Sequence, residues 1–266
     1  MIKSIQHGEL SYLCAEGISV PHCFTTRRGG VSTDLLSSLN IGIHRGDSRE
    51  NVLKNYEILG NALGFTPEQL VLTTQTHSDR VLVVDKAQQG AGLFAPELPE
   101  CDALITCTPG VGLVAFTADC TPILLWDPVT GAVGAVHAGW RGTASQIVRK
   151  AVLAMKDNFG TRPQDIRAAI GPNIGRCCFQ TDRDVPEALL QALGEGIRPY
   201  IRREGEKFYP DLKAINALIL NRAGVTRVEK SEYCTMCRPD LFWSHRLTGN
   251  QRGSQGALIL CRGAVK

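Results

Sequence analysis

The spacing of hydrophobic residues predicts first a helix and then a series of strands. After Asp47-Ser48 the apolar residues recur every three or four positions, which predicts a capped amphipathic helix carrying Val52, Tyr56, Leu59 and Leu63. Short apolar runs bounded by turn residues come next and predict strands at 69–74, 80–84, 103–106, 112–117, 123–126 and 132–136. The sequence Asp127-Pro128-Val129-Thr130-Gly131 predicts a turn that joins the last two strands as a hairpin.

Beyond residue 140 the helical spacing returns. One helix ending near Gly160 is predicted from the apolar face formed by Ala144, Ile147, Val148, Ala151, Val152 and Met155. Further patterns predict strands at 167–170 and 257–260 and helices at 184–193 and 212–222. Strands joined by hairpins and interrupted by helices indicate an α+β layered domain, with a mixed β-sheet flanked by helices. Because the chain has no repeat and no linker-like stretch, residues 1–266 are expected to form a single domain.

Composition and charge narrow the class of protein. The chain has no apolar run near the roughly 20 residues that cross a bilayer, and its first residues lack the apolar stretch of a signal peptide, so we expect a cytoplasmic protein that binds no membrane. The net charge of +3 is mild, and the lysines and arginines are scattered. This favours small anionic ligands over nucleic acid as partners.

The ten cysteines are spread through a chain without an export signal, so most are expected to be reduced thiols. Cys234-Thr235-Met236-Cys237 has the spacing of a zinc knuckle or a redox motif, but the chain contains no second pair of this kind. Cys177 and Cys178 are merely adjacent. Because a structural zinc site needs four ligands arranged tetrahedrally, structural or incidental roles are favoured over metal binding for these four cysteines.

Three residues that carry reactive groups follow or precede apolar runs. Cys120 lies in Thr117-Ala118-Asp119-Cys120-Thr121-Pro122, His137 follows seventeen residues later, and His77 lies 43 residues before Cys120. A thiolate and an imidazole at strand ends can form either a metal site or a nucleophile with its base. The separations match no short metal-binding motif, so the spacing leaves both interpretations open.

Two segments are candidate phosphate sites. A helix is expected to begin just after Trp140-Arg141-Gly142, and its free N–H groups would point toward His137. The same argument applies more weakly to Thr25-Thr26-Arg27-Arg28-Gly29-Gly30, where a guanidinium stands beside a glycine pair. An ordinary turn with a solvated arginine is an equally good interpretation of either segment.

Six motifs, in order along the chain, carry a resemblance to a known family. They are residues 26–32, 38–42, 75–77, 117–122, 137–142 and 171–175. Together they resemble the YfiH family, also called the multicopper polyphenol oxidase or laccase-domain family. The resemblance runs from about Thr25 to the carboxyl terminus.

The resemblance implies a zinc site, in which copper is also possible, with ligands at His77, Cys120 and His137. It implies purine nucleosides and phosphate as partners: phosphorolysis of adenosine, inosine, guanosine and S-methyl-5'-thioadenosine, with deamination of adenosine as a second activity. Cys120 and His137 then belong to the catalytic centre, with Asp102 and Asp119 as acid–base candidates. Substrate or phosphate contacts fall to Arg27, Asn40, Arg141 and Arg246.

The chain departs from the family pattern at two places. Ser78 follows the first metal histidine where the family usually has glycine, which alters the local turn but leaves the ligand. In Phe179-Gln180-Thr181-Asp182, glutamine replaces a family carboxylate and an aspartate appears two positions later, so a role for that acid is not carried over.

Two alternative functions stay open. One is a copper-dependent polyphenol oxidase, but a four-copper centre needs about ten histidines. The six of this chain exclude that centre, which leaves copper at the His77, Cys120, His137 site. The other is a cysteine hydrolase that edits peptidoglycan precursors, with Cys120 as nucleophile and His137 as base. This hydrolase would work without metal.

Overall fold

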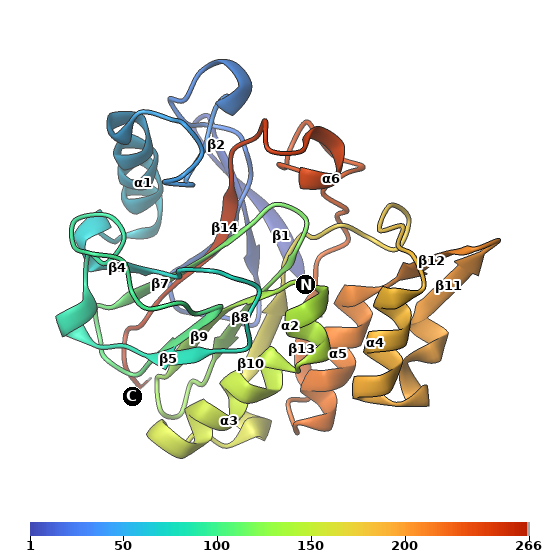
Figure 1. The fold of residues 1–266 in the computed structure, drawn as a ribbon. Coiled ribbons are helices and arrows are strands. Elements are labelled where there is room, and N and C mark those ends of the chain that lie inside the picture. The colour runs from blue at the N-terminus through green and yellow to red at the C-terminus, as the bar shows by residue number, and fades with distance from the viewer. Residues whose placement is uncertain (265–266) are drawn as a thin grey trace.

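A computed structural model describes residues 1–264, in which two six-stranded sheets pack face to face between helices (Figure 1). The first sheet has the order β1 (Ile2–His7), β2 (Leu10–Ala15), β3 (His22–Thr25), β14 (Gln255–Leu260), β7 (Gly112–Thr117), β4 (Leu70–Leu72). The second has the order β13 (Arg227–Lys230), β10 (Arg167–Ile170), β8 (Thr121–Trp126), β9 (Val133–Ala138), β6 (Ala103–Thr106), β5 (Val81–Val83). Both sheets mix parallel and antiparallel pairs.

Helices cover the outer faces of the two sheets. Helix α1 (Arg49–Leu63) packs on the first sheet, whereas α3 (Ile147–Phe159), α4 (Asp184–Leu193) and α5 (Leu212–Arg222) pack on the second. The short helices are α2 (Trp140–Ala144) and α6 (His245–Thr248), and a separate hairpin is formed by β11 (Ile201–Glu204) and β12 (Lys207–Pro210). Turns of 3₁₀ helix lie at Asp34–Leu36, Pro67–Gln69, Lys86–Gln88, Pro163–Asp165 and Glu195–Tyr200.

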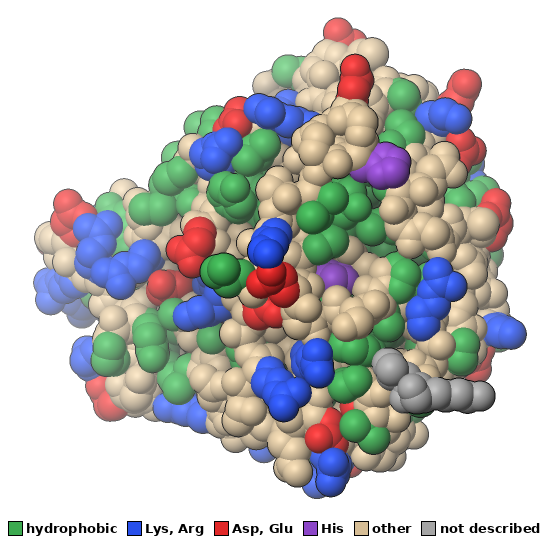
Figure 2. Space-filling view, turned by 180° about the vertical axis from the view of Figure 1, so that it is seen from behind, with side chains coloured by type: hydrophobic (Ala, Val, Ile, Leu, Met, Phe, Trp, Pro, Cys, Tyr) green, Lys and Arg blue, Asp and Glu red, His purple; other side chains and the backbone are tan. Residues whose placement is uncertain are grey.

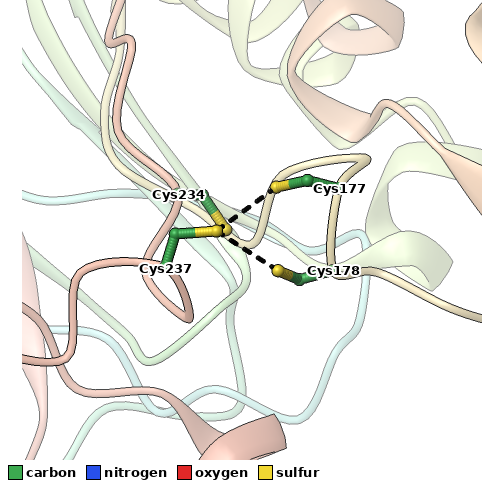
Figure 3. A group of neighbouring side chains, drawn as sticks. All are labelled: Cys177, Cys178, Cys234 and Cys237. Carbon is green, nitrogen blue, oxygen red and sulfur yellow. Dashed lines mark hydrogen bonds between the residues drawn. The ribbon is translucent and has the colours of Figure 1, made fainter.

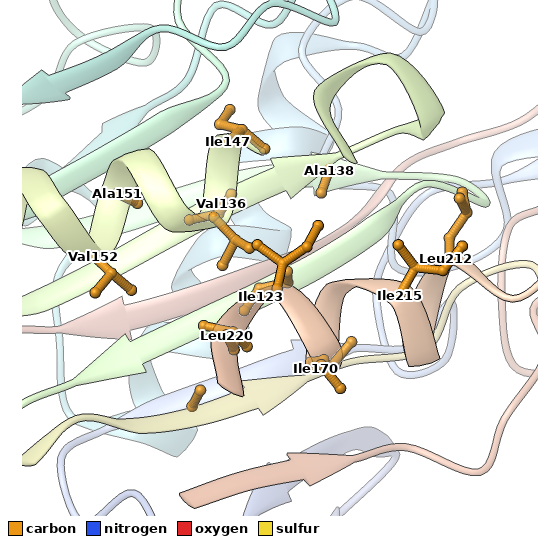
Figure 4. Packing of buried hydrophobic residues seen from close by; sticks show 14 of the residues in the cluster. Ile123, Val136, Ala138, Ile147, Ala151, Val152, Ile170, Leu212, Ile215 and Leu220 are labelled. Carbon is orange, nitrogen blue, oxygen red and sulfur yellow. The ribbon is translucent and has the colours of Figure 1, made fainter. Parts of the chain in front are cut away.

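The alternation of side chains along strand β8 explains the layers. Ile123 and Leu125 belong to the core between the second sheet and the helices, where Ile123 lies among residues of α3 and α5 (Figure 4). Leu124 and Trp126 point the opposite way, into the core between the two sheets. Because both faces of the strand are covered, all of its residues are buried and it is apolar almost throughout.

The predicted helices are present, with one interruption. Helix α1 begins as expected, because the Ser48 hydroxyl accepts a hydrogen bond of 3.1 Å from the Asn51 N–H. The single helix expected from Ala144 to Gly160 is instead α2 and α3, separated at Gln146, whose φ of 58° is left-handed. Gly160, also left-handed, ends α3 as predicted.

The predicted fold class is confirmed, and the strands and helices expected from residue 47 to residue 222 are all present. The layering differs from the expectation of one sheet, because there are two. The amino-terminal strands β1 to β3, the β11–β12 hairpin, β13 and α6 were not predicted. Strand β1 lies at a sheet edge and is largely exposed, so its sequence carries little of the apolar alternation that marks a strand.

Lysine and arginine side chains alternate with aspartate and glutamate over the face of the molecule in Figure 2. This mixed surface fits the mild net charge of +3. Among residues 1–264, no helix has the length and apolar character needed to cross a membrane.

Candidate metal centre and cavity

The register of the second sheet brings the three candidate ligands together. Strand β5 runs parallel to β6, β6 is antiparallel to β9, and β9 is antiparallel to β8. The first residues of β5, β6 and β8 therefore lie at the same end of the sheet as the last residues of β9. His77 precedes β5, Cys120 directly precedes β8, and His137 is the penultimate residue of β9. His77, Cys120 and His137 are separated by 43 and 17 positions in the sequence but are thus neighbours at one end of the strands.

The geometry of the three side chains fits a tetrahedral metal ion. Their ligand atoms all lie within 4.8 Å of one another, and the Cys120 Sγ is 3.7 Å from the His77 Nε2. Zinc bonds of about 2.3 Å to sulfur and about 2.0 Å to nitrogen would place two such ligand atoms about 3.5 Å apart. Two imidazoles and a thiolate are also a donor set that zinc or copper accepts, and three protein ligands leave a fourth position for water or substrate.

Asp102 lies behind His137 and orients it. The two residues stand opposite each other where β6 and β9 pair, and the Asp102 Oδ1 is 2.7 Å from the His137 Nδ1. This contact leaves the Nε2 of His137 free for a metal, as in many carboxylate–histidine–metal arrangements. Asp102 is fully buried, and the backbone N–H groups of His77 and Ser78 also donate to its carboxylate. Asp102 thus holds the His77–Ser78 turn and the His137 ring together, and its role as an acid or base stays a prediction.

The titratable groups of the centre are strongly coupled. Burial opposes ionisation of Cys120, but the two histidines outweigh it and lower the pKa of the thiol to about 6. Burial would lower the pKa of His137, but the Cys120 thiolate and Asp102 raise it to about 9. For Asp102, burial is outweighed by hydrogen bonds from His137 and Ser78, and the pKa falls to about 2. Without a metal ion, these shifts favour a thiolate beside an imidazolium.

Gly139 allows this close packing. A Cβ atom at this position would lie 2.9 Å from the Cδ2 of His77 and 3.1 Å from the Cys120 Sγ. Gly139 also precedes α2, which starts at Trp140, earlier than expected, and spans five residues. The helix next to the site is therefore much shorter than the continuous helix predicted to supply a positive dipole end.

A cavity of about 450 Å³ opens on the ligands, within the size range of small-molecule sites. The rings of Phe116, Trp140 and Phe179 line it together with four arginines, Arg45, Arg141, Arg246 and Arg252. The guanidinium of Arg141 lies over the Trp140 ring and that of Arg246 over the Phe179 ring, so aromatic and cationic groups are interleaved in the wall. The cavity thus offers surfaces for a flat ring and for an anion next to the metal centre.

Two residues expected to contact phosphate lie outside the cavity lining. The guanidinium of Arg27 donates to the carbonyls of Ser37 and Pro239 and lies 3.8 Å from the ring of Trp243. Asn40 is buried and bonds to backbone groups of Gly42 and Ser254 and to a neighbouring carboxylate. Both residues thus bond to neighbouring loops within the fold, and their contact with phosphate stays a prediction.

Asp119 does line the cavity, but its carboxylate is also engaged. Its Oδ1 accepts a hydrogen bond of 2.6 Å from the Thr235 hydroxyl, and its Oδ2 accepts from the Ser244 hydroxyl and the Arg246 N–H. Its backbone has a left-handed φ of 95°, an unfavourable conformation for aspartate that the surrounding bonds maintain. Asp119 therefore fixes the segment that presents Arg246 to the cavity.

The structure also identifies cavity residues that the sequence analysis missed. Burial, together with the nearby charge of Arg45, lowers the pKa of Arg252 to about 10, and the buried Nε of Arg252 has no acceptor in the described part of the chain. Two neighbouring guanidinium groups such as those of Arg45 and Arg252 can bind an anionic ligand. His44 lies 2.6 Å from Glu97 at the cavity rim and adds a titratable pair. His44 and Arg45 lie two and three positions after a motif of the resemblance, and that proximity was the available signal.

The chain is similar to known proteins in sequence and in fold. Residues 21–262 match the family model described as "Multi-copper polyphenol oxidoreductase laccase". The chain is 39% identical over 240 residues to the "Purine nucleoside phosphorylase YlmD" of Geobacillus stearothermophilus, covering 88% of this chain and 86% of that protein. It is 34% identical over 245 residues to the "Adenosine deaminase RL5" of an unknown prokaryotic organism, covering 90% and 93%. The crystal structure of Bacillus licheniformis YfiH superposes with a TM-score of 0.91 at 31% identity, covering 97% and 98%.

Proposed function

The chain belongs to the multi-copper polyphenol oxidoreductase laccase family, and from this premise we propose that it is a zinc-dependent purine nucleoside phosphorylase with adenosine deaminase as a second activity. Its substrates would be adenosine, inosine, guanosine and S-methyl-5'-thioadenosine, together with phosphate. The names of its relatives support this reaction class.

One observation carries the proposal: the ligand set of His77, Cys120 and His137 lies in the wall of a cavity that is also lined by aromatic rings and by four arginines. A purine ring requires flat apolar surface, which Phe116 and Phe179 supply. A phosphate ion requires several fixed cations, and the Arg45 and Arg252 pair is suited to this role, with Arg141 and Arg246 nearby.

The roles of the side chains follow from phosphorolysis itself. Phosphate must be held against the anomeric carbon of the sugar while the departing purine is stabilised, and the arginines hold the phosphate. The His44–Glu97 pair at the rim is the candidate for moving a proton to the departing base. A zinc ion held by the three ligands would supply a Lewis acid that polarises an oxygen of the substrates in phosphorolysis. It would also supply a water of lowered pKa, which is the nucleophile that deamination needs.

The test supplies adenosine, inosine and methylthioadenosine to zinc-loaded and copper-loaded protein, each with and without phosphate, and separates the products by chromatography. We expect phosphate-dependent release of free base and sugar 1-phosphate, and phosphate-independent formation of inosine from adenosine. Cys120→Ala should abolish both reactions, whereas Cys14→Ala, remote from the centre, should retain them. If neither metal form produces base or inosine while the copper form oxidises a phenol, the purine proposal is wrong.

The geometry also favours a second candidate, a metal-independent cysteine hydrolase. Cys120, His137 and Asp102 stand in the order nucleophile, base and orienting carboxylate, and the lowered thiol pKa is the property that such a nucleophile needs. This candidate requires full turnover of an amide substrate such as a peptidoglycan precursor after exhaustive chelation. Loss of all activity on chelation, restored by zinc, rules it out.

A further inference from the structure

Four cysteines outside the proposed active site lie together where two loops meet (Figure 3). Cys177 and Cys178 come from the loop after β10, and Cys234 and Cys237 from the loop after β13. Strands β10 and β13 are parallel neighbours, so their following loops leave the sheet at the same edge. The Thr235 N–H donates to the Asn173 carbonyl across the two loops. The adjacent pair and the C-x-x-C pair, separated by more than fifty residues in sequence, thus form one cluster.

The sulfur positions fit a mononuclear tetrahedral site. All four lie within 4.8 Å of one another, and the Cys237 Sγ is 3.6 Å from that of Cys177 and 3.4 Å from that of Cys178. Four zinc–sulfur bonds of about 2.3 Å place the sulfur atoms about 3.8 Å apart. A disulfide requires a separation of about 2.0 Å, and all four thiols are free. An iron–sulfur cluster would spread its cysteines over two or more iron atoms, which would place some sulfur pairs farther apart than these.

The surroundings of the cluster suit bound thiolates. The Gly175 N–H donates to the Cys234 Sγ at 3.2 Å, a contact that stabilises a sulfur ligand. Gly175 also leaves room for the cluster, because a Cβ there would lie 3.1 Å from the Cys177 Sγ, a tight contact. Cys234 is buried, whereas Cys177 and Cys237 are exposed, so an ion has a path of entry.

We propose that Cys177, Cys178, Cys234 and Cys237 bind a structural zinc ion, separate from the metal of the proposed active site. This ion would tie the two loops together. Phe179, next to Cys178, lines the cavity, and Thr235, between the other two ligands, holds the carboxylate of Asp119. The second site would therefore keep one wall of the cavity in place without contacting substrate.

The test counts zinc per chain in protein purified under reducing conditions and dialysed against a weak chelator. Wild type should hold two zinc ions. Cys237→Ser and Cys177→Ser should hold one, as should His77→Ala, which removes only the other centre. Cys14→Ser is the matched control and should hold two, because a serine there can keep the hydrogen bond to the His22 carbonyl.

Cobalt gives a second readout that needs no change to the cluster. His77→Ala loaded with Co²⁺ should show intense thiolate-to-cobalt charge-transfer absorption, and Cys237→Ser in the same background should lose most of it. The proposal is overturned if wild type holds a single zinc ion that His77→Ala removes. It is also overturned if peptide mapping of the purified chain, digested without reduction, reveals a disulfide at Cys237 in place of the second ion. Should the serine variants fail to fold, absence of the cobalt signal in His77→Ala decides against it.

Discussion

At the residue scale, Asp102 shows how much a metal ligand depends on the group behind it. We expect Asp102→Asn to weaken zinc binding by about 10- to 100-fold, because an amide nitrogen cannot accept from the donors that surround this position. A competition titration against a chromogenic chelator measures the change.

Ser78→Ala is the matched control for that variant. It removes only the hydroxyl that stands where the family has no side chain, while the Ser78 N–H still donates to Asp102. Its zinc affinity should stay close to wild type. Equal affinities for wild type and a folded Asp102→Asn protein would show that the carboxylate does not orient His137.

The thiol of Cys120 provides a pH-dependent test. In metal-free protein its alkylation rate should rise with pH and reach a plateau above its pKa of about 6, because the thiolate is the reactive form. Mass spectrometry of the labelled peptides follows each cysteine separately. Cys14, whose pKa burial raises to about 11, should still be accelerating at pH 9.

His137→Gln removes the main group that stabilises the thiolate, so the midpoint for Cys120 should move to higher pH. Added zinc should protect Cys120 in wild type. A Cys120 midpoint near 9 in the metal-free protein would contradict the proposed thiolate–imidazolium pair.

At the scale of elements, the junction between β9 and α2 is the most constrained. Gly139→Ala should weaken zinc binding on the order of tenfold or more, since its methyl group would contact His77 and Cys120 too closely and overpacking costs about 1–3 kcal/mol. The chelator titration applies again. Gly142→Ala, three residues on in α2, would place its methyl group 3.3 Å from the Ile147 Cγ2 and should have a smaller effect. An unchanged affinity in Gly139→Ala would mean that the ligands adjust freely.

Elements with a strong local signal were predictable from the sequence. Helices 184–193 and 212–222 match α4 and α5 residue for residue, and strands 103–106, 112–117 and 167–170 match β6, β7 and β10. The break at Gln146 was not predictable, because the apolar spacing continues across it and no glycine or proline marks it. Polar edge strands such as β13 were also not predictable, for a different reason. Their stability comes from pairing with a neighbouring strand, which the sequence of the strand itself does not show.

At the scale of the whole molecule, the two faces of β8 should contribute comparably to stability. Ile123→Ala opens the core beneath the helices and Leu124→Ala the core between the sheets, and each should lower the free energy of unfolding by about 2–5 kcal/mol. Urea denaturation of metal-free protein measures both. Val129→Ala, in the exposed turn of the same hairpin, should change it by less than about 0.5 kcal/mol. An unchanged free energy of unfolding in Leu124→Ala would contradict close packing between the sheets.

The sequence by itself determined the class of fold, most of the central elements and, through its motifs, the family and the three candidate ligands. These depend on local spacing and on residue identity, both of which are readable along the chain. Only the tertiary structure decided which aspartate faces the cavity and that Arg27 and Asn40 bond to neighbouring loops. It also decided that Arg45 and Arg252 line the same cavity and that two unlike cysteine pairs form one cluster. Those outcomes depend on strand register and on loops brought together from distant parts of the chain. Pairing between distant segments leaves no periodic trace in either one.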